Sequence, residues 1–70
     1  MRLKLITSNG ALGYYELPSK PDNPWKPMKL IIKAGPREYY LVEAYPEYVD
    51  GKWTIAIPIV RDEVELISIA

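Results

Sequence analysis

The sequence EYYLVEAYPEYVDGKWTIAIPIV, residues 38–60, decides the fold of this chain. Two apolar-rich runs meet at Asp50-Gly51, and this dipeptide between alternating apolar residues is the strongest local signal for a β-hairpin. A shift of one residue would turn the apolar side chains to the charged face, so register and burial support each other. The pairs expected on one face are Tyr48 with Trp53, Pro46 with Ile55, Ala44 with Ile57 and Val42 with Ile59.

The segments on either side of this hairpin also alternate between apolar and polar residues, which predicts further strands. Asn9-Gly10 predicts a two-residue turn that places Leu5 opposite Tyr14. Residues 35–37 are expected to form the loop of another hairpin, and residues 61–63 a turn into a last strand with Ile67 and Ile69 facing the core. The predicted strands are residues 1–7, 11–17, 28–34, 38–48, 52–60 and 64–69.

Four prolines at a spacing of three separate the second and third predicted strands. Because proline has no N–H to donate, residues 18–27 are predicted to form a stiff, proline-rich strap loop with Trp25 covering the sheet. Residues 21–26 also fit the PxxPx(K/R) pattern that SH3 domains bind as a ligand. The sequence therefore predicts one all-β domain, residues 1–70, as a six-stranded antiparallel small barrel or tightly rolled sheet of sequential hairpins.

The composition argues against catalysis and against metal or cofactor binding. The chain has neither cysteine nor histidine, so it lacks thiol nucleophiles, the usual general base and the commonest zinc ligands. Nine basic and nine acidic residues cancel, so no overall field attracts nucleic acid or an anionic membrane. No apolar run reaches the roughly 18 residues of a membrane span, and no signal peptide is apparent. We expect a non-enzymatic, cytoplasmic protein without a membrane partner.

An apolar stripe on the face opposite the predicted core is the main candidate site. Soluble monomers rarely expose a contiguous apolar area of this kind. Either the strap covers the stripe, or the sheet curls around it, or a protein partner or a second copy binds it. The candidate interface residues are Trp25, Ile31, Leu41, Pro58, Val60, Val64 and Leu66.

A nucleic-acid-binding face is the alternative, because small barrels bind single strands through aromatic side chains interleaved with basic ones. The zero net charge and the glutamates at positions 38, 43 and 47 argue against it. The residues of this alternative face are Tyr15, Lys29, Lys33, Tyr39 and Tyr45.

The number and length of the predicted strands resemble those of SH3-like and OB-like small barrels, a resemblance of architecture that spans the chain without a diagnostic motif. The absence of His, Cys, Gln and Phe, with favourable turn residues in the hairpins, is also similar to computationally designed β domains. A hyperthermophilic protein is the other origin we consider, and both imply thermostability. The resulting function hypotheses are a non-catalytic scaffold or protein-binding module and, as the alternative, a nucleic-acid-binding small barrel.

Overall fold

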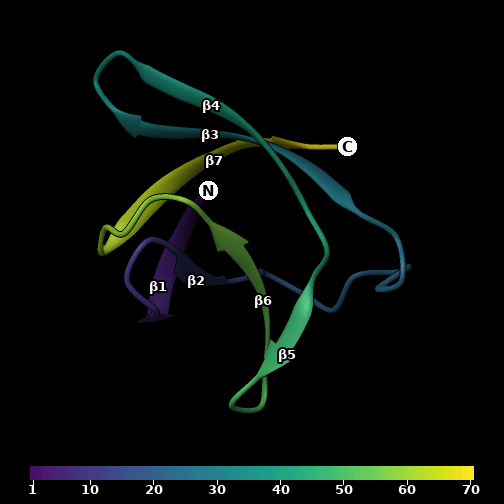
Figure 1. The fold of residues 1–70 in the computed structure, drawn as a ribbon. Coiled ribbons are helices and arrows are strands. Elements are labelled where there is room, and N and C mark those ends of the chain that lie inside the picture. The colour runs from purple at the N-terminus through teal and green to yellow at the C-terminus, as the bar shows by residue number, and fades with distance from the viewer.

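The structure is a computed structural model that describes residues 1–70 as a single rolled antiparallel sheet of seven strands (Figure 1). Neighbouring strands follow the order β4-β3-β7-β1-β2-β6-β5. The all-β prediction is confirmed, and the structure contains no helix that could span a membrane. The strands are β1 (Arg2–Ser8), β2 (Gly13–Glu16), β3 (Met28–Gly35), β4 (Glu38–Ala44), β5 (Glu47–Val49), β6 (Lys52–Ile57) and β7 (Glu63–Ile69).

The Asp50-Gly51 turn forms as predicted, but its hairpin is shorter than expected. Both turn residues have positive φ, 50° and 78°, as a two-residue hairpin turn requires. Tyr48 pairs with Trp53, and the ladder ends at Glu47. The predicted continuation through Ala44 and Val42 is wrong, because Pro46 is buried and has no N–H to donate to a ladder. The predicted strand 38–48 therefore splits into β4 and β5, which gives seven strands instead of six.

The β3–β4 hairpin has the predicted register. Leu30 pairs with Val42, and Lys29 pairs with Glu43. The loop is one residue shorter than the predicted 35–37, because Gly35 pairs with Glu38 after a β-bulge between Lys33 and Gly35. The turn residues and the alternating pattern agree in this segment, so local sequence was sufficient to place both strands.

The register of β1 with β2 differs from the prediction by one residue. Leu5 pairs with Tyr15 rather than Tyr14, and a β-bulge follows between Leu5 and Thr7. The turn is longer than two residues, and Asn9 donates its backbone N–H to the Leu12 carbonyl at 3.0 Å. The shift directs the Tyr15 ring into the core, where it is fully buried.

The predicted pairing of the last strand with the strand before it is wrong. Pro58 ends β6 at Ile57, and residues 58–62 carry the chain across the molecule. β7 then lies between β3 and β1, with Leu66 paired to Ile32. Its side chains Val64 and Leu66 are buried, whereas Ile67, at a β-bulge, is about half exposed, so the predicted inward position of Ile67 is wrong. Ile69 pairs with the buried Leu30 and therefore shares the inner face as predicted, although it is about half exposed at the end of the strand.

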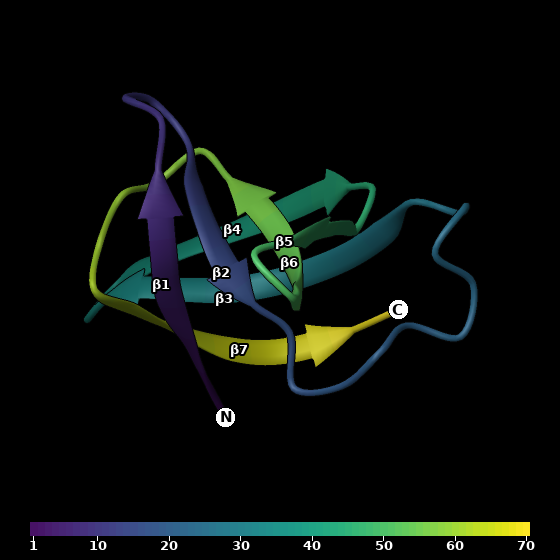
Figure 2. The same cartoon turned by 90° about the horizontal axis from the view of Figure 1, so that it is seen from below.

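The sheet rolls into a half-barrel because β1 belongs to both of its halves. Arg2 to Lys4 pair with β7, and Leu5 to Ser8 pair with β2. Figure 2 shows β1, β2 and β6 crossing over β3, β4 and β7. β4 approaches β6 without forming backbone pairs, so the roll stays open along β4. The buried core consists of Leu3, Tyr15, Leu17, Leu30, Ile32, Val42, Ile55, Ile57, Val64 and Leu66.

Residues 18–27 contain no strand, as predicted, but Trp25 does not cover the sheet. Its side chain is 68% exposed. Lys26 donates its backbone N–H to the Asn23 carbonyl at 3.0 Å, which makes residues 23–26 a β-turn. A β-turn interrupts the extended polyproline II conformation in which SH3 domains bind PxxP ligands, so this interpretation of residues 21–26 loses support.

Candidate protein-binding surface

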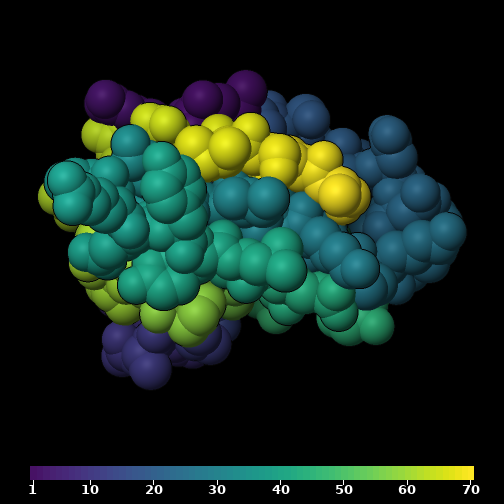
Figure 3. All heavy atoms as spheres, turned by 90° about the horizontal axis from the view of Figure 1, so that it is seen from above, coloured from purple at the N-terminus to yellow at the C-terminus, as the bar shows by residue number.

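The outer face of β3, β4 and β7 carries exposed apolar side chains in the middle of the sheet. Leu41 is 73% exposed, and its cross-strand partner Ile31 is 40% exposed. Across β3, Ile31 pairs with Ser68, and the exposed Ile67 lies at the bulge beside this pair. We call Leu41, Ile31 and Ile67 the outer apolar row. In Figure 3 the atoms of β3 and β4, in teal, and of β7, in yellow, form one continuous surface.

Charged side chains on this face are engaged by their neighbours. The Lys33 ammonium lies 5.6 Å from the centre of the Tyr39 ring, and the Lys29 ammonium lies 3.8 Å from the Glu43 carboxylate. Both contacts are exposed to solvent, so each contributes little to stability. The Lys29–Glu43 pair is neutral, whereas Lys33 keeps its positive charge over the Tyr39 ring, so the outer apolar row is flanked by one neutral pair and one cation.

The backbone of β4 is unpaired along its outer edge. β4 pairs only with β3, and the eight backbone hydrogen bonds outside the strand ladders include none from residues 38–44. In an antiparallel strand alternate N–H and C=O groups point to opposite neighbours, so β4 presents a row of free donors and acceptors. This seven-residue strand contains no proline and no lysine, and its two charged residues, Glu38 and Glu43, are each paired with a cationic side chain of the same molecule.

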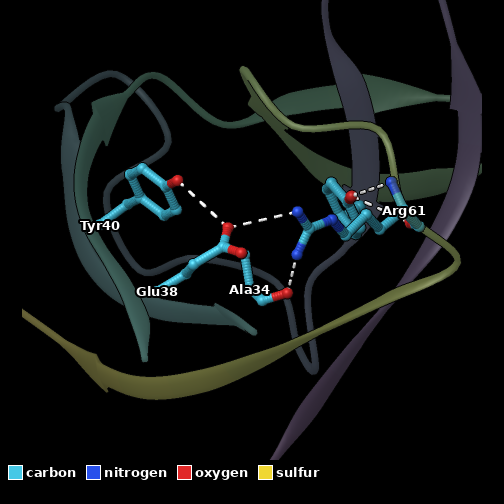
Figure 4. A network of polar contacts seen from close by, with 5 residues as sticks. Ala34, Glu38, Tyr40 and Arg61 are labelled. Atoms are coloured by element: carbon cyan, nitrogen blue, oxygen red, sulfur yellow. Dashed lines mark hydrogen bonds and ion pairs between the residues drawn. The ribbon is translucent and has the colours of Figure 1, made fainter. Parts of the chain in front are cut away.

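A polar network closes one end of the open side of the half-barrel (Figure 4). The buried Tyr15 hydroxyl accepts a hydrogen bond from the Arg61 backbone N–H at 3.0 Å and lies 2.7 Å from the Ile59 carbonyl oxygen, to which it donates. The Arg61 guanidinium donates to the Ala34 carbonyl and to the Glu38 carboxylate, at 3.2 Å in the second case. These contacts hold the 58–62 segment against the β3–β4 turn, so we assign the network a structural role.

The structure brings only two of the seven predicted interface residues together. Ile31 and Leu41 are adjacent on the outer face, whereas Val64 and Leu66 lie in the core because β7 has the opposite facing. The remaining three, Trp25, Pro58 and Val60, are on connecting segments outside the sheet. Sequence reasoning missed Ile67, because its outward position depends on a bulge, and missed the open β4 edge, because that depends on strand order.

The residues of the alternative nucleic-acid face are not gathered into a basic aromatic surface. Tyr15 is fully buried, and its hydroxyl is used by the backbone of residues 59–61. Lys29 and Lys33 are engaged by Glu43 and Tyr39 on the outer face. Tyr45 is exposed on the link between β4 and β5. The set therefore offers one lysine over one tyrosine ring and no row of stacked rings lined by basic side chains, which is the arrangement that single strands need.

Two further features bear on what the surface can do chemically. An open pocket of about 530 Å³ lies between the 17–28 segment and the C-terminal residues Ile69 and Ala70, and its lining is mostly prolines and exposed polar side chains. No cluster of three or more His, Cys, Asp or Glu side chains is positioned to hold a metal ion. The open edge beside the outer apolar row is therefore the feature that points to binding. Comparisons with models of protein families, with curated proteins and with solved structures give no match to this chain.

Proposed function

We propose that this domain is a non-catalytic protein-binding module that takes an extended segment of its partner along β4. The observation that carries the proposal is the unpaired edge of β4 next to the exposed Leu41 and Ile31 side chains. Adding a strand to a free sheet edge is a common mode of peptide recognition, in which backbone hydrogen bonds give affinity and alternate side chains give specificity.

The positions of the side chains on β4 define the ligand. Tyr39, Leu41 and Glu43 share the outer face of the strand, and Leu41 stands at its centre. Alternate side chains of an added strand would lie beside these three residues, with an apolar residue next to Leu41. The outer apolar row extends this contact onto β3 and β7, and buried apolar area contributes about 25 cal/mol per Å². The preferred ligand is thus an extended peptide with alternating apolar residues.

A displayed library of random peptides tests this proposal and does not require an identified partner. We expect the immobilised wild-type domain to enrich peptides with alternating apolar residues, and Leu41→Lys to reduce their retention at least tenfold. Trp25→Lys is the matched control, because it makes the same kind of change at an exposed residue outside the sheet. It should retain the selected peptides as well as the wild type does.

Circular dichroism melting should show that both variants fold as the wild type does, since each replaces an exposed side chain. The proposal is wrong if the wild-type domain, immobilised as a monomer, enriches no peptides above a protein-free surface. It is also wrong if folded Leu41→Lys retains the selected peptides as well as Trp25→Lys.

A further inference from the structure

We infer that the strand added to β4 is β4 of a second copy of this chain, so that two molecules form a twofold-symmetric dimer with one continuous sheet. This inference rests on the proposed function of the β4 edge and names its partner. Two identical strands that pair antiparallel are related by a twofold axis, which gives the commonest symmetry of soluble dimers.

The faces of the sheet restrict the register of such a pair. Residues opposite each other in a sheet point to the same face, so odd-numbered outer residues of one copy must face odd-numbered residues of the other. An axis at Leu41 satisfies this condition and pairs every residue of Glu38–Ala44. An axis at Tyr40 or Val42 leaves end residues of β4 without a partner. The full register therefore places Leu41 opposite Leu41 of the second copy.

This register is chemically self-complementary on the outer face. Because Ile31 pairs with Leu41 within each copy, the apolar row would run from Ile31 through both Leu41 side chains to the second Ile31. Tyr39 would lie opposite Glu43 of the second copy, next to the lysine that already contacts that carboxylate. On the other face Glu38 would lie opposite Ala44 of the second copy. The Glu38 carboxylate already contacts the Arg61 guanidinium of its own chain at 3.2 Å. No two like charges are directly opposed, a placement that would destabilise the pair.

The second edge of the sheet explains why the assembly should stop at two copies. β5 has only three residues and follows the buried Pro46, so it offers little backbone to an incoming strand. Both β4 edges are used in the twofold pair. The contact is therefore closed, whereas a head-to-tail contact between β4 and β5 would propagate into a filament.

Single introduced cysteines test the register, because the unmodified chain has none. With the axis at Leu41, two Leu41→Cys residues face each other within disulfide reach. Two Tyr39→Cys residues would be offset by four positions, more than about 13 Å at 3.3 Å per residue. We expect Leu41→Cys to form a disulfide-linked dimer at least tenfold faster than Tyr39→Cys, although both positions are exposed on the same strand. Equal rates for the two variants would overturn the inference.

Sedimentation equilibrium of the unmodified chain tests the dimer itself. For the wild type we expect the measured mass to approach twice that of the monomer as the protein concentration rises. The mass of folded Leu41→Lys should stay at that of the monomer. The control Trp25→Lys should dimerise as the wild type does. A wild-type chain that stays monomeric at millimolar concentration but binds the selected peptides would overturn self-pairing and leave the proposed function standing. A chain that neither dimerises nor binds peptides would overturn both.

Discussion

The inner and outer faces of the β3–β4 hairpin are built from similar side chains with opposite environments. Leu30, Ile32 and Val42 on the inner face are almost completely buried, whereas Ile31 and Leu41 on the outer face are exposed. Hydrophobicity alone does not separate the two groups, because their residue types are nearly the same. Their position in the two-residue repeat of the strand separates them, because it buries the first group in the core and leaves the second group free for the association that we propose.

The largest expected effect is at the inner face. Ile32→Ala should lower the free energy of unfolding by about 2 to 5 kcal/mol, because it leaves a cavity in a closely packed core. In dilute solution, where the chain is monomeric, Leu41→Ala should change it by less than about 0.5 kcal/mol, because that side chain is exposed. Urea denaturation of the two variants measures the difference. If both lose the same free energy, the two faces are equally buried and the comparison fails.

Two adjacent tyrosines on β2, Tyr14 and Tyr15, allow the same comparison of an exposed with a buried group for a single hydroxyl. Tyr15→Phe should cost about 1 to 3 kcal/mol of stability, because it removes the buried hydroxyl that bonds the partly buried backbone groups of Ile59 and Arg61. The Tyr14 hydroxyl only accepts an exposed bond from Asn9 at 3.3 Å, so Tyr14→Phe should cost less than about 0.5 kcal/mol. Thermal and urea unfolding of both variants, measured together, would show the opposite order if Tyr15 pointed outward.

The ion pair at the open side of the half-barrel should matter less than either core group. Arg61→Met removes the guanidinium contacts with Glu38 and Ala34 but leaves the backbone of residue 61 bound to Tyr15. Because both charged side chains are about half exposed, we expect a loss of at most about 1 kcal/mol that shrinks at high salt. A loss that is several-fold larger, or independent of salt, would contradict a solvent-screened contact.

The smallest expected effect is at Trp25, which is a large apolar residue on neither face of the sheet. Trp25→Ala should change the free energy of unfolding by less than about 0.5 kcal/mol, because most of this side chain is in solvent. The fluorescence maximum of the remaining tryptophan and the urea midpoint provide the measurement. A loss of about 3 kcal/mol would show that Trp25 covers the core after all.

Local sequence predicted the parts of the fold that depend on neighbouring residues. The β3–β4 register and the Asp50-Gly51 turn follow from alternation and turn chemistry alone. The position of β7 does not, because it depends on a connection across the molecule, and Pro58 marks only where β6 ends. The bulges after Leu5 and at Ile67 also left no local signal, and each changed which side chains face the core.

The candidate site, like the fold, was predictable only where it depends on residues within one hairpin. Leu41 and Ile31 were placed correctly, because their register is set within one hairpin. Pairing of the last strand with the strand before it would put Val64 and Leu66 on the surface, but β7 pairs with β3 and β1 instead and both side chains are buried. The free edge of β4 is a property of strand order, which no pattern of residues within β4 specifies.

Amide hydrogen exchange along β4 at two protein concentrations is the most direct test of the open edge. At low concentration we expect alternate amides of Glu38–Ala44 to exchange rapidly and the others, paired with β3, to be protected. At high concentration the rapid set should become protected as well, because the second copy supplies its partners. Protection of every β4 amide in dilute solution would contradict this by showing that β4 is already paired on both sides within one chain.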